Sequence, residues 1–305
     1  MGRFYNFLLW IANAARFIIS IRNKLLKGEY FVNIREITGL LQQNPVISWH
    51  EHVPGENEGF EKLDTVFADN QLKVMDTLGI DKIVVSLPVA ADRNCPPEKF
   101  IAANDIVYEA IQRYPGRVYG QAFVNPGYIK ETIAELERCV KKLGFVGVKL
   151  YHQYFMDDPA MFPLIEKCIE LDIPILMHCA HIMDPETRKR QPRCSGGDHM
   201  ANIARRYPEA TFLMGHIGGG GDWQWEIKAI ADCPNVYADI GGSIYDRPLI
   251  EESIRYLGAD RLLFASDGIW SSAISKVLGA DISDEDKKTI LSGRAFNRFI
   301  EKAGR

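Results

Sequence analysis

The side chains best suited to chemistry are two histidines one residue apart and four further polar residues spread along the chain. His50 and His52 end the stretch "ISWHEH" at 47–52. Side chains at i and i+2 of a strand point the same way, so both imidazoles could converge on one object. Alone, the pair could equally belong to a polar loop. The other four candidates are Lys149, His178, His216 and Asp267. Imidazoles and carboxylates are the ligands that zinc and similar divalent ions take.

Each of these residues lies at or just after the end of a short apolar run, and eight such runs alternate with longer helical patterns. The runs are Val46–Trp49, Lys82–Leu87, Val118–Val124, Phe145–Leu150, Ile173–Met177, Thr211–Met214, Asn235–Asp239 and Leu262–Ala265. Continuous apolar runs of this length are typical of parallel strands that are buried on both faces. Helices are expected at about 60–79, 97–114, 127–143, 159–171, 198–207, 222–232, 246–257 and 284–302.

Residues typical of helix caps stand at the predicted helix ends and support this assignment. Gly79 and Gly144 follow helical segments, as C-terminal caps do, and Ser283 precedes an acidic first turn. Eight β/α units in about 260 residues predict an α/β fold, a closed (β/α)₈ TIM barrel over residues 45–305. An open doubly wound sheet is the alternative, but it would favour a glycine-rich phosphate loop after the first strand, which is missing. Barrel enzymes carry their chemistry at the carboxyl ends of the strands, where all six candidates fall.

Residues 1–44 precede this pattern, and we expect them to form a helical extension of one or two amphipathic helices. The apolar run from Phe7 to Ala12 is too short to span a membrane, which needs about 20 apolar residues. The basic residues Arg16, Arg22 and Lys24 continue the helical pattern. The extension is expected to pack on the barrel or on a partner subunit, with a membrane-surface role as the alternative.

Composition narrows the partners and the compartment. The chain has 305 residues, of which 47% are hydrophobic and 25% charged, and its net charge is −4. No basic tract indicates a nucleic-acid partner. The six cysteines are scattered without a C-x-x-C pair, which argues against a disulfide scaffold and fits a reducing cytoplasm. We therefore expect a cytoplasmic homo-oligomer that acts on a small molecule, with no nucleic acid and no membrane as partner.

Taken together, the strand-end motifs resemble the amidohydrolase superfamily, in its amidohydrolase-related branch, which includes the aminocarboxymuconate-semialdehyde-decarboxylase-like proteins. The resemblance covers residues 45–302 in order and is specific as a set. The motifs are "WHEH" (49–52), "GFVGVKLYH" (144–152), "DIPILMHC" (172–179), "YPEATFLMGHIGG" (207–219), "NVYADIGGS" (235–243) and "LLFASDG" (262–268).

The resemblance implies a divalent metal held by His50, His52, His178 and Asp267. Asp267 would double as general base, and His216 would lie beside the metal and polarise the substrate or stabilise an oxyanion. A single ion, Zn²⁺ first and Mn²⁺ or Fe²⁺ as alternatives, is favoured. In binuclear relatives a strand-four lysine is carboxylated and bridges two metals, so Lys149 could do the same. Otherwise it aims at a substrate carboxylate.

This sequence departs from the family at Ser48, where an acidic residue usually stands two positions before the first histidine. That position is not a ligand, so the expected metal site survives the change. Near the strand ends, Tyr151, His152 and Trp270 are expected to contact substrate together with Lys149. Glu51 lies between the two histidines and should point the other way, into the barrel wall.

The first functional hypothesis is a metal-dependent hydrolase, in which metal-activated water attacks an amide, lactone or ester of a small molecule. The alternative is a non-oxidative decarboxylase, a lyase that acts on a small aromatic or unsaturated carboxylic acid. The ligand set alone does not separate them, since both reactions need the same Lewis acid. A non-catalytic barrel that serves as a binding module is the third hypothesis, and the intact ligand set argues against it.

Overall fold

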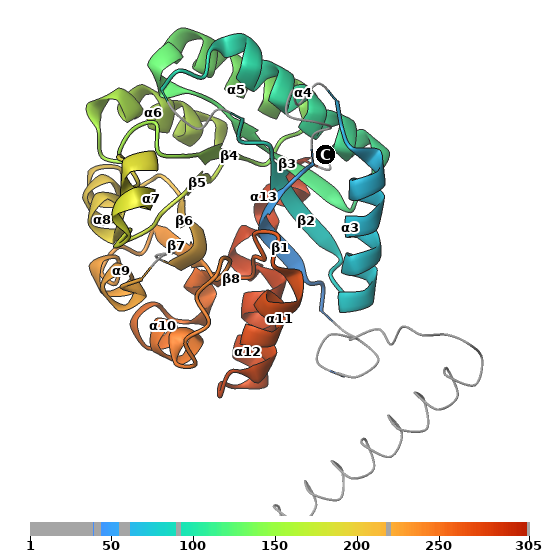
Figure 1. Cartoon of the computed structure of the whole chain (residues 1–305), viewed down its shortest axis with the longest axis vertical. Helices are drawn as coiled ribbons and strands as arrows, with labels where there is room; N and C mark the ends of the chain where they lie inside the picture. Colours follow the sequence, from blue (N-terminus) through green and yellow to red (C-terminus); the bar gives the residue numbers. More distant parts are fainter. Residues whose placement is uncertain (1–38, 40–43, 55–61, 90–92, 218–220, 304–305) are drawn as a thin grey trace, which may run out of the picture.

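The protein is a parallel (β/α)₈ barrel, seen in Figure 1 along its shortest axis. The computed structural model describes residues 39, 44–54, 62–89, 93–217 and 221–303. The strands are β1 (Ile47–His52), β2 (Lys82–Ser86), β3 (Val118–Phe123), β4 (Gly147–Leu150), β5 (Ile175–Met177), β6 (Phe212–Met214), β7 (Val236–Asp239) and β8 (Leu262–Leu263). All eight expected strands are present, most of them one or two residues shorter than predicted.

The strands pair in sequence order, and every pair from β1–β2 to β7–β8 is parallel. The first strand and the chain after β8 meet through backbone bonds. Trp49 N donates to Phe264 O at 2.9 Å, and Asp267 N donates to His50 O at 3.1 Å. These contacts bring β1 next to β8, so the predicted TIM barrel is confirmed and the open sheet is excluded.

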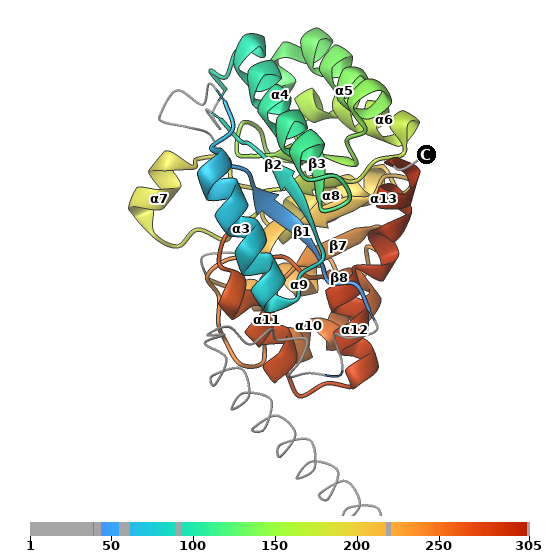
Figure 2. The ribbon, with the colours of Figure 1, turned by 90° about the vertical axis from the view of Figure 1, so that its right-hand side faces the viewer.

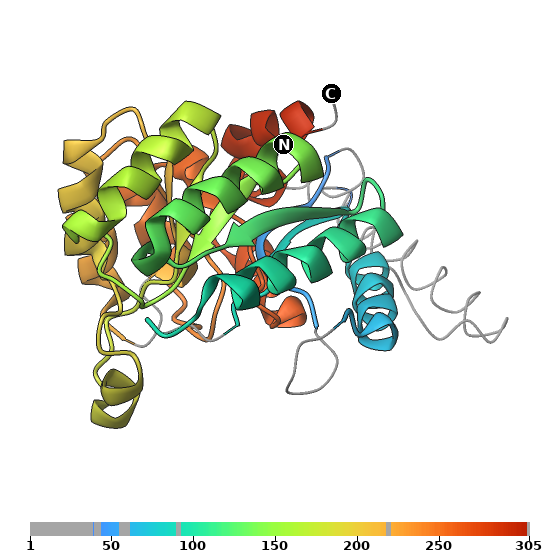
Figure 3. The same cartoon turned by 90° about the horizontal axis from the view of Figure 1, so that it is seen from above.

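Helices surround the strands as an outer ring (Figures 1 and 2). They are α3 (Thr65–Leu78), α4 (Pro97–Arg113), α5 (Ile129–Leu143), α6 (Phe162–Leu171), α7 (Pro185–Arg190), α8 (Gly197–Arg206), α9 (Trp223–Ala229), α10 (Leu249–Leu257), α11 (Trp270–Gly279), α12 (Asp284–Ser292) and α13 (Asn297–Ala303). Short 3₁₀ turns are η2 (Pro126–Tyr128), η3 (Pro159–Met161), η4 (Gly215–Ile217), η5 (Ala259–Arg261) and η6 (Arg294–Phe296). Figures 2 and 3 show α7 standing away from the ring.

The expected helix caps are confirmed. Gly79 and Gly144 end α3 and α5 with left-handed φ values of 72° and 74°, which glycine adopts at low cost. Ser283 Oγ accepts a hydrogen bond from Asp286 N at 3.1 Å at the start of α12. The single helix expected at 284–302 is wrong, because the chain breaks at Gly293 into α12 and α13.

The break at Gly293 is caused by packing inside the barrel. Trp49 is fully buried on β1, and its ring meets Phe296 edge-on with centroids 5.0 Å apart. Phe296 belongs to an inner cluster that fills the amino end of the barrel, where residues of the strands pack against η6 and α13. Its buried members are Ile47, Trp49, Val84, Val146, Leu176, Leu213, Leu263, Phe296, Phe299 and Ile300. A side chain at position 293 would overlap the indole of Trp49, so this close approach requires glycine.

Gly293→Ala is expected to lower the free energy of unfolding by about 2–3 kcal/mol, as overpacking and left-handed strain do. Gly293 has φ 58°, and an added Cβ would overlap Trp49 Nε1. Urea unfolding followed by circular dichroism measures the effect. Gly279→Ala is the matched control, because no heavy atom lies within 4 Å of its added Cβ. Equal midpoints for the two variants would contradict the packing explanation.

The expected helical extension over 1–44 lies almost entirely outside the described residues. Among the described residues, no helix is both long and apolar enough to cross a membrane. Helices α7 and α11 were not expected, since "PETRKR" has no apolar period and the segment after Asp267 carries no cap signal.

Candidate active site

Three of the expected ligands lie together at the carboxyl ends of β1 and β8. His52 Nε2 is 3.1 Å from Asp267 Oδ1, and His50 Nε2 is 3.8 Å from the same oxygen. One donor atom from each of the three residues falls within 4.8 Å of the others. Two imidazole nitrogens and one carboxylate oxygen at this spacing suit a divalent cation. The donor set therefore fits the implied metal.

A buried carboxylate orients the first of these histidines. Asp239, at the end of β7, is fully buried, and its Oδ2 lies 2.9 Å from His50 Nδ1. Its Oδ1 accepts hydrogen bonds from His216 N at 2.7 Å and Gly241 N at 2.9 Å. A carboxylate on Nδ1 fixes the tautomer and leaves Nε2 free to bind a metal. Asp239 was not predicted to be part of the site, although it ends the strand motif "NVYAD" at the same end of the barrel as the candidate ligands.

His178 and His216 form a pair beside this group. His216 Nε2 is 3.0 Å from His178 Nδ1, and His178 Nε2 is 3.1 Å from Gln191 Oε1. His178 therefore engages both ring nitrogens with protein partners and lies outside the three-residue donor cluster. His216 is buried with a left-handed φ of 45°, and an added Cβ at Gly242 would come within 2.9 Å of its Cβ. Strained residues of this kind concentrate at functional sites.

Lys149 lies beneath the imidazoles at the end of β4. Its Nζ is 2.7 Å from His50 Nε2 and 5.1 Å from the ring centroid of Tyr151. The side chain is fully buried, and burial lowers the pKa of Lys149 to about 8. Tyr151 in turn stacks on His178 with centroids 4.2 Å apart. The lysine thus meets the same nitrogen that a metal would use.

The pKa values of the residues in and around the donor cluster favour the binding of a cation. Burial lowers the pKa of His52, takes that of His178 well below its usual value and brings that of His216 to about 4. Burial alone would raise the pKa of Asp267, but the hydrogen bond with His52 and the neighbouring imidazoles outweigh it and hold that pKa below its usual value. At neutral pH the imidazoles of His52, His178 and His216 are therefore neutral, and the carboxylate of Asp267 is ionised.

A cavity of about 320 Å³ opens directly beside the three-residue donor cluster. Its lining includes Asp267, His178, His216, Gly242 and Ser243, with Ile182, Met183 and Ile269 on the apolar side. This volume suits a small-molecule ligand. None of the four expected substrate contacts, Lys149, Tyr151, His152 and Trp270, lines this cavity. His152 is mostly buried with its ring against Tyr151, and Trp270 packs on the main core, whereas its neighbour Ile269 lines the cavity.

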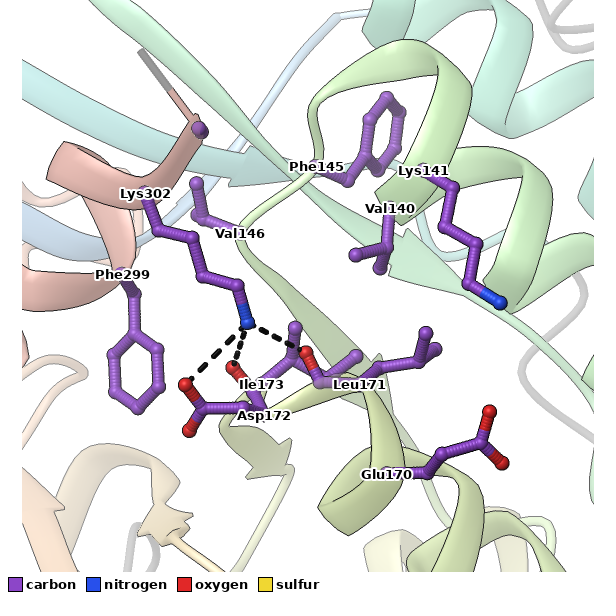
Figure 4. A pocket seen from close by; sticks show the side chains of 11 residues that line it. Val140, Lys141, Phe145, Val146, Glu170, Leu171, Asp172, Ile173, Phe299 and Lys302 are labelled. Carbon is purple, nitrogen blue, oxygen red and sulfur yellow. Dashed lines mark hydrogen bonds and ion pairs between the residues drawn. The ribbon is translucent and has the colours of Figure 1, made fainter. Parts of the chain in front are cut away.

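A second cavity of about 320 Å³ lies at the opposite end of the barrel (Figure 4). It is lined by residues that precede β4 and β5 and by α13, including Phe145, Val146 and Phe299. Lys302 reaches across it and donates to Leu171 O at 2.9 Å, and its Nζ is 3.4 Å from Asp172 Oδ2. These contacts tie α13 to the turn before β5. The amino end of a barrel contributes stability rather than chemistry, so the first cavity is the candidate site.

A third cavity, next to α9, contains a buried acid outside the donor cluster. Glu226 has a side chain 5% exposed, accepts a hydrogen bond from Gly197 N, and lies 3.8 Å from His181 Nδ1. Burial raises the pKa of Glu226 to about 7, and the nearby carboxylates of Asp198 and Asp222 add to the effect.

Glu226→Gln is expected to flatten the pH dependence of stability between pH 5 and pH 8. The folded pKa of about 7 exceeds the usual 4.5, so the folded state holds the proton more tightly, and this contribution is lost as pH rises through 7. For one group the loss reaches about 3 kcal/mol. Urea unfolding of metal-free protein measures it, with the exposed Glu209→Gln as control. Parallel curves for wild type and Glu226→Gln would contradict the assignment.

Comparison with known proteins agrees with this geometry. The family described as Amidohydrolase matches residues 52–295. Gamma-resorcylate decarboxylase of Polaromonas sp. strain JS666 is 28% identical over 284 residues, covering 76% of this chain and 86% of the relative. The 2-keto-4-carboxy-3-hexenedioate hydratase of Sphingobium sp. is 24% identical over 285 residues, covering 76% and 83%. These relatives favour the predicted alternative, decarboxylation, over hydrolysis.

Solved structures share the fold. The crystal structure of a dihydroxybenzoic acid decarboxylase from Polaromonas sp. JS666, with bound manganese and the inhibitor 2-nitroresorcinol, matches with a TM-score of 0.65. It is 23% identical and covers 86% of this chain and 98% of its own. The cation in that structure is manganese, whereas zinc was the first choice from the sequence.

Proposed function

Because this chain belongs to the amidohydrolase family, we propose that it is a divalent-metal-dependent decarboxylase of a small aromatic or unsaturated carboxylic acid. The observation that carries the proposal is the donor cluster of His50, His52 and Asp267 at the edge of a small-molecule cavity. The gamma-resorcylate decarboxylase that resembles the chain over 76% of its length supports the reaction type. Hydrolysis, the first expectation from the sequence, has no such support and is set aside.

The metal would be held by His50, His52 and Asp267, with His178 as the expected fourth ligand once it leaves its protein partners. When bound, a divalent cation supplies a Lewis acid that polarises the oxygens of the substrate. Mn²⁺ and Zn²⁺ both suit this mixed imidazole and carboxylate set. A single ion is proposed, because the three donors already converge on one point and Lys149 contacts His50 directly.

The reaction breaks the bond between the carboxyl carbon and the carbon that carries it, releases CO₂ and adds one proton to that carbon. Asp267 and His216 both line the cavity and are proposed to move this proton. Asp267 is 25% exposed, so it can exchange the proton with solvent. His216 is held against His178, which fixes its ring at the cavity wall. Lys149 is proposed to bind the substrate carboxylate, and Tyr151 is proposed to pack against the face of the substrate.

Product mass tests the proposal. Purified protein loaded with Mn²⁺ is incubated with hydroxybenzoic acids and with unsaturated di- and tricarboxylic acids. A product lighter by one CO₂ is expected. A hydratase is the second candidate, favoured by the Sphingobium relative, and it would give a product heavier by one water. Metal analysis should find about one equivalent per chain. The absence of both products and of bound metal would overturn the proposal.

The remaining expectations from the sequence stay predictions. A cytoplasmic location and a homo-oligomer are untested by the structure, as is the helical extension over 1–44.

A further inference from the structure

Glu51 makes an unusual set of contacts for a residue between two proposed ligands. Its side chain is 1% exposed and turns away from the imidazoles, as expected from the strand alternation. One carboxylate oxygen accepts from Ser266 N at 2.9 Å and the other from Gly268 N at 3.2 Å. The Ser48 hydroxyl donates to the first oxygen and itself accepts from Ser266 N at 3.1 Å.

These two N–H groups flank Asp267. The intervening Asp267 N donates to His50 O at 3.1 Å, so three consecutive backbone donors after β8 are bound by β1. Asp267 itself has a left-handed φ of 49°. A non-glycine residue in that region is strained and persists only where its surroundings hold it. The carboxylate of Glu51 accepts two of the four hydrogen bonds that β1 makes to these N–H groups, and Ser48 Oγ and His50 O accept the other two.

We propose that Glu51 is a positioning residue: its carboxylate fixes the backbone at 266–268 so that the Asp267 side chain faces His50 and His52. This inference rests on the proposed function, in which Asp267 binds the metal. Without the two acceptors on Glu51, the Ser48 hydroxyl and the His50 carbonyl would hold the strained segment less firmly, and the Asp267 carboxylate would lose its fixed direction.

The nature of the group supports a role beyond packing. An ionisable side chain at this depth is costly, and this one is accommodated by hydrogen bonds from Ser48, Ser266 and Gly268. An apolar residue would fill the same volume without that cost. What an apolar residue lacks is the pair of acceptors for the N–H groups on either side of Asp267.

Ser48 gives the proposal a compensating variant. Its hydroxyl meets the same Ser266 N as Glu51 does, on the same side of the strand end. An acid at position 48 would place a carboxylate within reach of that donor. The acceptor could thus be moved from residue 51 to residue 48 without touching a proposed ligand.

The test is Mn²⁺ affinity, measured on the full-length protein by the electron paramagnetic resonance signal of free Mn²⁺. Glu51→Gln is expected to weaken binding by about tenfold or more, the range seen when a residue that orients a ligand is lost. The double variant Ser48→Asp with Glu51→Gln is expected to recover most of the affinity. Glu226→Gln is the matched control, since it also removes a buried acid that binds a backbone N–H, and its affinity should equal that of wild type.

The possible outcomes distinguish a failure of the Glu51 inference from a failure of the proposed function. If wild type binds Mn²⁺ and Glu51→Gln binds it equally well, with only its unfolding midpoint lowered, Glu51 is structural and the inference is wrong while the proposed function stands. If wild type binds no Mn²⁺, the metal-dependent function falls and the inference falls with it. If Glu51→Gln does not fold, the double variant decides, and a folded double variant without Mn²⁺ affinity overturns the proposal.

Discussion

The Asp267→Asn variant is expected to fold normally, to purify with little metal and to lose about 10³-fold in kcat/KM for decarboxylation, within the range for a lost proton-transfer group. Asparagine has the shape of aspartate and tolerates the left-handed φ of 49° at this position, so the backbone has no reason to change. The substitution removes the negative charge that faces His52 at 3.1 Å and His50 at 3.8 Å. It also removes the acceptor that exchanges protons with the cavity.

Metal content by mass spectrometry and steady-state kinetics measure the two losses. Asp172→Asn is the matched control, because Asp172 also has φ 49° but lies at the amino end of the barrel beside Lys302. It should change activity less than about twofold, as surface substitutions do. An Asp267→Asn enzyme that keeps both its metal and its rate would remove Asp267 from the site.

The Lys149→Met variant is expected to keep its metal and to lose about 10²-fold in kcat/KM, mainly through KM, as the loss of a buried charged contact to a substrate does. Methionine fills the volume of the lysine stem. It removes the ammonium that lies 2.7 Å from His50 Nε2 and competes with a cation for that nitrogen. Mn²⁺ affinity should therefore be unchanged or higher than that of wild type.

The number of metal ions bound by this variant tests whether the site holds one ion or two ions bridged by a carboxylated Lys149, a choice that the sequence left open. If Lys149 were carboxylated and bridged two ions, wild type would hold two equivalents and the methionine variant would lose both. One equivalent in both proteins is the expected result. Lys302→Met, at the opposite end of the barrel, removes a lysine that binds only Leu171 and Asp172 and should leave metal and kinetics unchanged.

Local patterns were enough to predict the strands and to bring three of the candidate ligands together. The apolar runs are the strands, and because strand ends in a barrel share one face, His50, His52 and Asp267 could be placed together from sequence alone. Asp239 was missed for a physical reason. A carboxylate that orients an imidazole looks the same in sequence as one that ends a strand, and only the 2.9 Å contact to His50 Nδ1 tells them apart.

Long-range causes explain the other differences. The orientation of Glu51 followed from strand alternation, but its partners are backbone N–H groups 215 residues away, and a backbone group leaves no mark in the sequence. The helix expected at 284–302 breaks because Trp49, on the first strand, packs against Gly293. His178 sits in the expected place, yet its two ring nitrogens are engaged by His216 and Gln191.

The contact between β1 and the chain after β8 also links the proposed cofactor to folding. The donors His50 and His52 come from the first strand of the barrel and Asp267 from the last, so the site exists only when the ends of the barrel have met. A metal that binds there binds the closed barrel and not the unfolded chain. Its binding energy then adds to folding stability, by about 2.7 kcal/mol when free metal is a hundred times its Kd. Removing the metal with a chelator should therefore lower the unfolding midpoint of this protein.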